Sequence, residues 1–299
     1  MSDSLAEVLT DVTIREGSQQ KSDLWGVGSQ KKLEIVRLQK AVGIKSIELT
    51  AFAPGEWFAD ADELAEGVKG CCGKMVVKAL YFNVRGAERL QRYPYLQQAG
   101  IVHTAVTEGY RIKNYNQQSI DDALLKLRGF VEWFSSNGFT FDVLLFSTSW
   151  GDKSTGILDS ATSMRCIEKF MNEAERCGSL PTQITLADTE GVVDPRSLSE
   201  LVQQVKRAFP EQKICLHLHP SREAAVAVVE AGLEAEADLW EGAWLGIGGS
   251  PLADGAGGNL DIRTLVEVYQ QNGIPTGFDP VQIESLEKRI AEIRSPQKK

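Results

Sequence analysis

The sequence predicts a (β/α)8 barrel, and two observations lead to this fold class. Eight short apolar runs alternate with eight longer amphipathic stretches within 299 residues, which is the count and length of such a barrel. A Gly-x-Gly-x-x-Gly motif, typical of dinucleotide-binding open sheets, does not follow the first run. A doubly wound open sheet would explain the alternation equally well, but the count of eight and the missing motif favour the barrel.

Each element is expected from its own segment of the chain. In chain order, the predicted strands are Leu9–Ile14, Ser46–Thr50, Met75–Phe82, Ile101–Thr107, Phe141–Thr148, Gln183–Asp188, Lys213–His219 and Leu239–Gly246. Apolar residues spaced by three and four predict the helices Gln30–Ala41, Ala61–Val68, Ala87–Gln98, Ser119–Ser136, Ala161–Cys177, Arg196–Phe209, Arg222–Ala231 and Ile262–Gln271. A last polar helix is expected at Val281–Ile293. We therefore expect one barrel domain over residues 1–299, with a short helical tail from about residue 280.

Composition narrows the function classes. The net charge of −9 and the pI of about 5.1 predict a surface that repels phosphate backbones, so nucleic acid is not expected as a partner. No apolar run approaches membrane-spanning length, and the first residues lack the pattern of a signal peptide. The five cysteines do not have zinc-site spacing, which favours reduced thiols. We therefore expect a cytoplasmic protein without membrane contact.

The seventh predicted strand ends in two histidines. His217 and His219 are two of only three histidines in the chain, and alternate residues of a strand point to the same side. The pair therefore converges at the carboxyl end of the strand, where barrels place their chemistry. Two converging imidazoles make half of a divalent-metal site. Taken alone, the motif is equally compatible with two hydrogen-bonded strand histidines.

Four other predicted strands also end in polar residues. These segments are Asp11–Gln19, Glu48–Thr50, Asp188–Glu190 and the glycine-rich Gly246–Asn259. Acids and an amide beside the two imidazoles favour a hard cation, Mg²⁺ or Mn²⁺, over zinc. Arg15 is a candidate to neutralise an oxyanion or carboxylate, and the alternative is a structural ion pair with Glu48 or Asp188. The glycine-rich segment is either a flexible turn or a lid that approaches a ligand closely.

Three motifs together resemble a known superfamily. They are Asp11-x-Thr-x-Arg-x-Gly-x-Gln, His217-x-His219 and Gly258-Asn259. This combination resembles the DRE-TIM metallolyases, which include hydroxymethylglutaryl-CoA lyase, isopropylmalate and homocitrate synthases and 2-oxo-acid aldolases. Further segments resemble the hydroxymethylglutaryl-CoA lyase branch, namely Ile47–Trp57, Ser147–Gly156, Leu186–Val192 and Gly248–Leu260. The resemblance extends from Asp11 to about Phe278 and implies a pyruvate carboxyltransferase-type domain.

Carried over position by position, the resemblance implies a metal site and a catalytic set. The implied ligands of the Mg²⁺ or Mn²⁺ ion are Glu16, His217, His219 and Asn259. The implied catalytic residues are Arg15, Glu48, Asp188, His217 and Ser250. Arg15 would stabilise an enolate oxygen, and Glu48 would orient Arg15. Asp188 would hold a substrate hydroxyl or assist proton transfer.

The chain departs from the family pattern at three of its positions. Glu16 stands where the family has aspartate, Ser250 where the lyases have a catalytic cysteine, and Pro220 where an acid or amide is usual. Glutamate is one methylene longer and should still bind a hard cation. A serine hydroxyl is a far poorer acid than a thiol, so the proton transfer assigned to Ser250 is weakened. These departures favour a relative with a shifted substrate.

The leading expectation is a divalent-metal-dependent carbon–carbon lyase that acts on a 3-hydroxy-acyl-CoA or a hydroxy carboxylic acid. One alternative is a Claisen-type condensing enzyme that joins an acyl-CoA to a 2-oxo acid, and another is an inactive metal- or ligand-binding barrel. The chain stops soon after the eighth unit, as the lyases do, which favours cleavage. The expected partner is a small molecule. Acyl-CoA and a second copy of the chain remain open, and Arg111, Lys113 and Lys153 either meet CoA phosphates or form a solvated rim.

Overall fold

The computed structural model describes residues 3–249 and 257–294, which fall into two compact units. Of the described residues, the first unit combines 3–98, 241–249 and 258–294, and the second combines 99–240 and Gly257. Among the described residues, the strands of the main sheet follow the order β3-β2-β1-β10-β9-β8-β5-β4. Apart from the short hairpin strands β6 and β7, each strand thus has its predecessor or successor in the chain as a neighbour, which is the strand order of a (β/α)8 barrel.

The first unit begins with short elements and ends with a long helix. Its elements are α1 (Leu5–Val8), β1 (Leu9–Asp11), α2 (Thr13–Ser18), α3 (Ser29–Val42), β2 (Ser46–Phe52), α4 (Ala61–Val68), β3 (Val76–Tyr81), α5 (Val84–Leu90), the end of β10 (Leu239–Gly242), η1 (Trp244–Gly246), α11 (Ile262–Gln271) and α12 (Pro280–Ile293). Strands β1, β2 and β3 pair in parallel. Gly43 ends α3 in the left-handed region at φ 104°, and Asp279 caps the start of α12.

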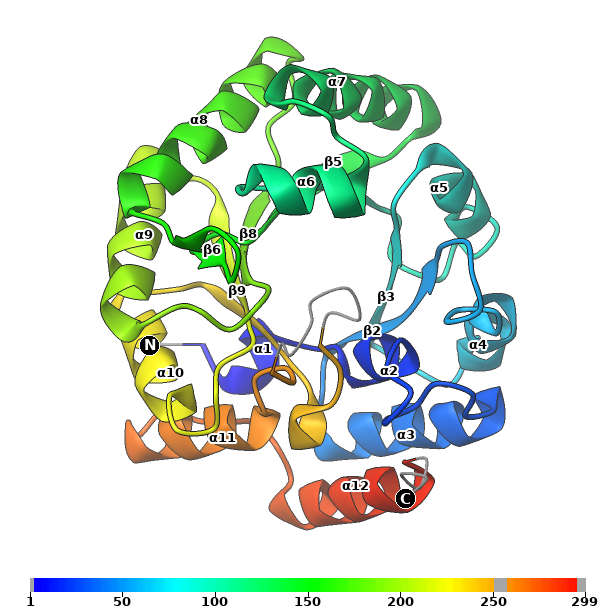
Figure 1. Cartoon of the computed structure of the whole chain (residues 1–299). Helices are drawn as coiled ribbons and strands as arrows, with labels where there is room; N and C mark the ends of the chain where they lie inside the picture. Colours follow the sequence, from blue (N-terminus) through cyan, green and yellow to red (C-terminus); the bar gives the residue numbers. More distant parts are fainter. Residues whose placement is uncertain (1–2, 250–256, 295–299) are drawn as a thin grey trace. The chain divides into compact units, whose positions relative to one another are not determined.

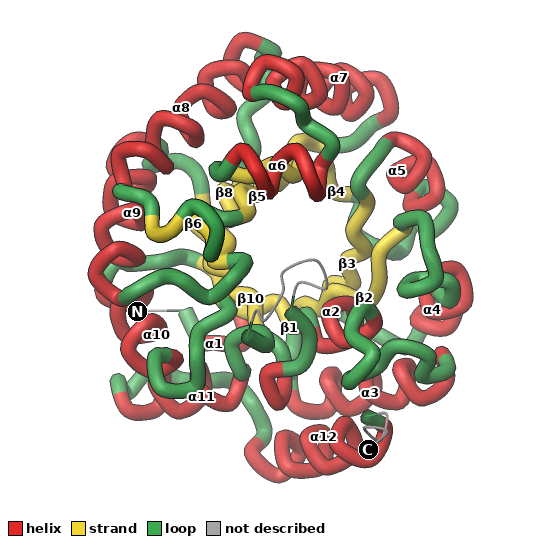
Figure 2. Tube along the Cα trace, in the orientation of Figure 1, coloured by secondary structure: helices red, strands yellow, loops and turns green. Residues whose placement is uncertain are grey.

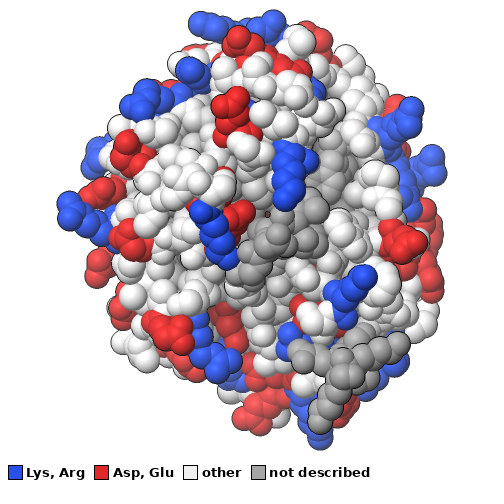
Figure 3. All heavy atoms as spheres, in the orientation of Figure 1, with Lys and Arg blue, Asp and Glu red and all other residues white. Residues whose placement is uncertain are grey.

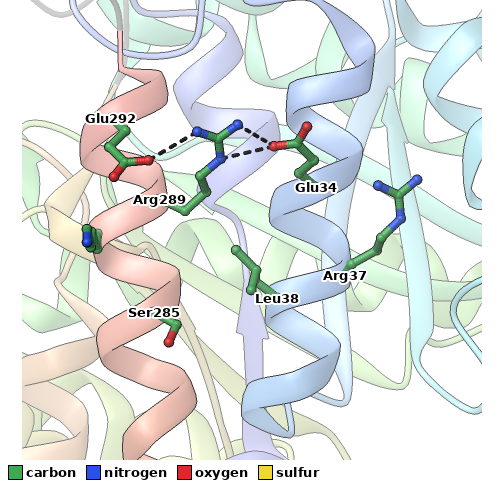
Figure 4. Close-up of a pocket in the computed structure, with 7 residues that line it drawn as sticks. Glu34, Arg37, Leu38, Ser285, Arg289 and Glu292 are labelled. Carbon is green, nitrogen blue, oxygen red and sulfur yellow. Dashed lines mark hydrogen bonds and ion pairs between the residues drawn. The ribbon is translucent and has the colours of Figure 1, made fainter.

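Helix α12 packs along α3 within the first unit (Figure 1). Its buried face consists of Ile283, Leu286, Ile290 and Ile293. Figure 4 shows Arg289 of α12 between Glu34 of α3 and Glu292, with its Nε atom 3.0 Å from a carboxylate oxygen of Glu34. An apolar stripe and a charged contact thus fix the helix that the sequence predicts at Val281–Ile293.

The second unit contains four parallel strands, and all of its helices except the one at 108–115 lie outside them (Figure 2). Its elements are β4 (Ala99–Ala105), α6 (Glu108–Tyr115), α7 (Ile120–Asn137), β5 (Thr140–Ser147), the hairpin β6 (Gly151–Asp152) and β7 (Gly156–Ile157), α8 (Ser160–Arg176), β8 (Gln183–Asp188), α9 (Pro195–Ala208), β9 (Lys213–Leu218) and α10 (Ala225–Glu234). Strands β4, β8 and β9 are buried almost throughout, as expected for parallel strands covered on both faces.

Several predicted boundaries are wrong. The strand expected at Leu9–Ile14 ends at Asp11, because the Asp11 carboxylate accepts a hydrogen bond from the Thr13 N–H and the chain turns into α2. The helix expected at Ala87–Gln98 begins earlier, at Val84, because the Asn83 side chain caps its first turn. It ends at Leu90. Helix α6 and the β6–β7 hairpin were not predicted. The last strand ends at Gly242 rather than at Gly246, because the chain enters η1.

The surface carries both signs of charge. On the face drawn in Figure 3, lysine and arginine side chains are interspersed with aspartate and glutamate. No helix in the part of the chain that the structure describes is long and apolar enough to cross a bilayer.

Candidate functional site

Helix α2 holds the arginine and the acid that the sequence predicts. Arg15 Nε donates to Glu48 Oε2 of β2 over 2.8 Å, and Arg15 also forms an ion pair with Glu16. All three side chains are buried, Arg15 with 8% of its surface exposed. Thr13 Oγ1 accepts from the Trp244 N–H over 2.9 Å, which fixes α2 against the segment after β10. The expected contact between Arg15 and Glu48 is thus present in the structure.

Charge pairing dominates the electrostatics of this cluster. Burial by itself would lower the pKa of Arg15, but the carboxylates of Glu16, Glu48 and Glu241 outweigh it and raise the pKa. Burial raises the pKa of Glu48, Arg15 lowers it, and the Glu241 carboxylate raises it further. Arg15 therefore stays cationic in a region that water hardly reaches, where a fixed cation stabilises a developing negative charge strongly.

Gly248 brings Glu16 and Asn259 to the same point. Asn259 Nδ2 donates to the Ile247 carbonyl over 2.7 Å, which orients the amide. Gly248 has φ 92°, and a Cβ at this position would lie 2.4 Å from Glu16 Cβ and 2.5 Å from Asn259 Nδ2. Only glycine fits there. A carboxylate and an amide, two oxygen donors for a hard cation, therefore flank one residue of the glycine-rich segment.

The two predicted histidines converge in the second unit. The Nε2 atoms of His217 and His219 are 3.1 Å apart, and both side chains are buried. Gly191, in the turn after β8, packs against the second of them, since a Cβ there would lie 2.3 Å from the His219 carbonyl oxygen. Two imidazole nitrogens this close can bind one cation together, or share one hydrogen bond as a metal-free pair does.

Asp188 lies at the carboxyl end of β8 with one oxygen anchored. Its Oδ1 accepts from the N–H groups of Val192 and Val193 over 2.9 and 3.3 Å. Its Oδ2 has no hydrogen-bond partner among the described residues. Burial raises the pKa of Asp188 to about 6, although the two N–H groups and His217 lower it. A carboxylate with one free oxygen and a pKa near neutrality suits proton transfer.

The sheet register adds residues that the sequence reasoning missed. His103, Leu145, Thr185 and Cys215 are aligned across β4, β5, β8 and β9, so their side chains share one face of the sheet. Two residues further along, the same face carries Ser147 of β5 and His217 of β9. Tyr115 of α6 reaches Ser147, with 2.7 Å between the two hydroxyl oxygens. As the third histidine, His103 was visible in the sequence, but only the register places it on the His217 face.

The basic residues considered for CoA phosphates behave differently from one another. Arg111 is 6% exposed and its Nη1 donates to the Ala105 and Val106 carbonyls over 3.2 and 3.4 Å, so it serves the backbone of its own unit. Lys113 and Lys153 are exposed. Burial excludes the solvated-rim alternative for Arg111, whereas Lys113 and Lys153 can still either meet CoA phosphates or form a solvated rim.

The donor chemistry fits a divalent cation. Within residues 3–249 and 257–294, no three His, Cys, Asp or Glu side chains gather closely enough to form a metal site. The predicted donors instead come as two pairs, Glu16 with Asn259 and His217 with His219. Carboxylate, amide oxygen and imidazole are ligand types that Mg²⁺ and Mn²⁺ accept. Ser250, the remaining predicted residue, lies outside the described residues.

Comparison with known proteins decides the family. The sequence profile described as HMGL-like matches residues 7–290. This chain belongs to the HMGL-like family. The resemblance to the DRE-TIM metallolyases, and to their hydroxymethylglutaryl-CoA lyase branch, is thereby confirmed, and the chain is an enzyme of this type.

Two curated relatives resemble this HMGL-like chain over nearly their whole length. An (R)-citramalyl-CoA lyase of Chloroflexus aurantiacus is 25% identical over 290 residues, which cover 92% of this chain and 86% of the relative. Hydroxymethylglutaryl-CoA lyase YngG of Bacillus subtilis is 25% identical over 291 residues, which cover 95% of this chain and 92% of the relative.

Solved structures confirm the fold class. The HMG-CoA lyase of Brucella melitensis superposes with a TM-score of 0.82 at 20% identity, covering 97% of this chain and 99% of that chain. The HMG-CoA lyase of Acinetobacter baumannii in complex with coenzyme A and 3-methylmalate gives a TM-score of 0.80 at 23% identity, covering 97% and 92%. The predicted (β/α)8 barrel is therefore correct.

Proposed function

We propose that this HMGL-like chain is a divalent-metal-dependent lyase that cleaves a carbon–carbon bond of a 3-hydroxy-acyl-CoA. The observation that carries the proposal is the buried Arg15, fixed by Glu48 over 2.8 Å beside Glu16. A guanidinium held in this way is ready to accept the negative charge of an enolate before the charge forms. The curated relatives named as citramalyl-CoA and hydroxymethylglutaryl-CoA lyases support the substrate class.

The proposed metal ligands are Glu16, Asn259, His217 and His219, and the proposed ion is Mg²⁺ or Mn²⁺. Their support is the donor chemistry of the two pairs and the motifs shared with the family. When bound, such an ion polarises the hydroxyl and carbonyl oxygens of a substrate. The longer Glu16 side chain is accommodated, since its Oε2 also accepts from the Gly249 N–H over 3.1 Å.

Proton transfer is proposed for Asp188. Its free Oδ2 accepts the proton of the substrate hydroxyl, the carbon–carbon bond then breaks, and the electron pair forms the enolate of the departing acyl-CoA. Arg15 stabilises the enolate oxygen, and Glu48 keeps the guanidinium in place. Ser250 is proposed to return a proton to the enolate carbon, less readily than a thiol would.

The recognition of CoA is proposed to involve Lys113 and Lys153. Both ammonium groups belong to exposed residues of the second unit, where they can meet phosphates without a large desolvation cost.

A cytoplasmic location and a second copy of the chain as partner stay predictions.

The test is an assay of the purified protein with Mn²⁺ or Mg²⁺, supplied separately with hydroxymethylglutaryl-CoA and (R)-citramalyl-CoA. We expect one of them to be cleaved to a shorter acyl-CoA and an oxo acid, detected by mass spectrometry, and EDTA to stop the reaction. Release of free thiol from acetyl-CoA and a 2-oxo acid, without cleavage, would show the condensing enzyme instead. Metal binding without either reaction would contradict the proposal for these substrates.

A further inference from the structure

Three side chains hold the first residues of the glycine-rich segment. Asp23 Oδ2 accepts from the Gly248 N–H over 2.9 Å, Gln20 Nε2 donates to the Gly249 carbonyl over 2.7 Å, and Glu16 Oε2 accepts from the Gly249 N–H. Gln20 and Asp23 lie in the turn that follows α2. Both backbone groups of Gly249 and the amide of Gly248 are therefore fixed by residues more than two hundred positions earlier in the chain.

Asp23 also binds the end of the carboxy-terminal helix. Its Oδ1 accepts from Arg294 Nε over 2.7 Å, and Arg294 is the C-cap of α12. Asp23 is only 3% exposed, whereas the Arg294 side chain is 37% exposed. One buried carboxylate thus links the end of α12 to the Gly248 amide, and Arg294 neutralises its charge.

The contact between Asp23 and Gly248 lies beside two of the proposed metal ligands. Gly248 has no room for a Cβ because Glu16 and Asn259 close around it. A shift of the Gly248 amide therefore moves a proposed metal ligand on either side of it. We propose that Asp23 is a positioning residue, oriented by Arg294, that holds Gly248 and thereby the Glu16 and Asn259 donors. The predicted effect on turnover rests on the proposed function, whereas the effect on Gly248 does not.

The contact between Asp23 and Arg294 is not needed to hold helix α12 in place. The helix is already fixed on α3 by its apolar stripe and by Arg289, which binds Glu34 (Figure 4). Arg289 lies on the same helix and makes the same kind of contact, but its partners are Glu34 and Glu292 rather than Asp23. It therefore provides a matched control for a loss of helix packing.

The experiment compares Asp23→Ala, Arg294→Ala, Arg294→Lys and the control Arg289→Ala. Hydrogen exchange of the Gly248 and Gly249 amides is measured by mass spectrometry, Mn²⁺ binding by titration, and kcat and KM with the cleaved substrate. In Asp23→Ala we expect faster exchange at these amides and about 10-fold to 100-fold weaker Mn²⁺ binding, as for other residues that orient metal ligands. Arg294→Ala should also speed exchange and weaken Mn²⁺ binding. Arg294→Lys keeps the positive charge and should retain most of the wild-type protection and Mn²⁺ affinity.

The control variant Arg289→Ala separates a loss of helix packing from a loss of the Gly248 contact. Arg289→Ala should lower the melting temperature without changing exchange at Gly248 or the Mn²⁺ affinity. Unchanged exchange and Mn²⁺ affinity in Asp23→Ala would overturn the inference. If the wild type cleaves none of the acyl-CoA substrates but exchange and Mn²⁺ binding respond as expected, the proposed function fails and the role of Asp23 stands.

Discussion

Arg15 is the residue on which most of the proposed chemistry depends. Its guanidinium is buried between the carboxylates of Glu16 and Glu48, and Glu241 adds a third negative charge nearby. The sequence suggested two alternatives, a catalytic arginine or a structural ion pair with Glu48 or Asp188. The structure shows the pair with Glu48, and such a pair also orients a catalytic guanidinium, so the two alternatives do not exclude each other.

Replacing Arg15 with Met should abolish most of the turnover. The methionine keeps the bulk of the side chain but removes the charge that we propose stabilises the enolate, so we expect kcat to fall by about 10²-fold to 10³-fold. Circular dichroism should show that the fold persists. Arg89→Met, which removes a partly exposed ion pair with Asp62, is the control and should leave kcat unchanged. A similar kcat in Arg15→Met and the wild type would refute the assigned role.

Asp11 should make the stability depend on pH. Burial raises its pKa to about 6, although bonds from Thr13 and Gln39 lower it. Because the folded pKa lies above 3.8, the ordinary value of an aspartate, protonation favours the folded state. The contribution is therefore fully present below pH 4 and is lost as the pH rises through about 6.

The size of this contribution is on the order of 3 kcal/mol, from about two pKa units at about 1.4 kcal/mol each. Asp11→Asn has no titrating carboxyl, so its free energy of unfolding should fall less than that of the wild type between pH 4 and pH 7. Urea unfolding at both pH values measures the difference. Equal pH dependence in the two proteins would show that Asp11 does not titrate in this range.

At the scale of elements, the turn after β8 supports the histidine pair. Gly191 has φ 69°, and a Cβ there would press on the His219 carbonyl from 2.3 Å. The Asp188 carboxylate organises the same turn through Val192 and Val193. The position of His219 therefore depends on a neighbouring strand's turn as well as on β9.

Gly191→Ala should displace His219 and weaken Mn²⁺ binding. Gly178→Ala is the matched control, since Gly178 has φ 72° but no atom within 4 Å of the added Cβ. The backbone strain common to both variants costs about 1 to 2 kcal/mol. Only Gly191→Ala should cost more than this in a denaturant titration and also lower the Mn²⁺ affinity. The same loss in both variants would mean that the contact with His219 does not matter.

Three helices with capping side chains were predicted well, whereas helix α5, which is also capped, and helix α6 were not. The helices capped by Ser119, Asp159 and Asp261 were expected within a few residues of their observed ends, because a cap acts over three residues. Helix α6 was missed because part of what sets its place is the contact of Tyr115 with Ser147, 32 positions later, beside the Arg111 bonds to the Ala105 and Val106 carbonyls. No local sequence pattern predicts the contact between Tyr115 and Ser147.

At the scale of the whole chain, the carboxy-terminal helix contributes to the stability of the first unit. Leu286 is fully buried in the packing of α12, whereas Val281 on the same helix is 67% exposed. The helix was expected as a polar tail, but its apolar stripe makes it part of a core.

Leu286→Ala should therefore destabilise the protein by about 2 to 5 kcal/mol, the usual cost of a cavity in a core. Val281→Ala should change the free energy of unfolding by no more than about 0.5 kcal/mol, because the removed methyl groups face water. Thermal unfolding of both variants measures the difference. Similar melting temperatures would show that α12 is not part of the cooperative unit.

The sequence by itself determined the fold class and the family, and it supplied most of the proposed site residues. Alternating apolar runs specify the strand and helix count, and the motifs at the strand ends name Arg15, Glu48, Asp188 and the histidine pair. These are local properties of short segments. Only the tertiary structure decided that Arg15 and Glu16 lie on a helix, that Arg111 serves the backbone, and that Asp23 joins Gly248 to Arg294. The Asp23 contacts join residues more than two hundred positions apart, so they follow from packing and not from any pattern along the chain.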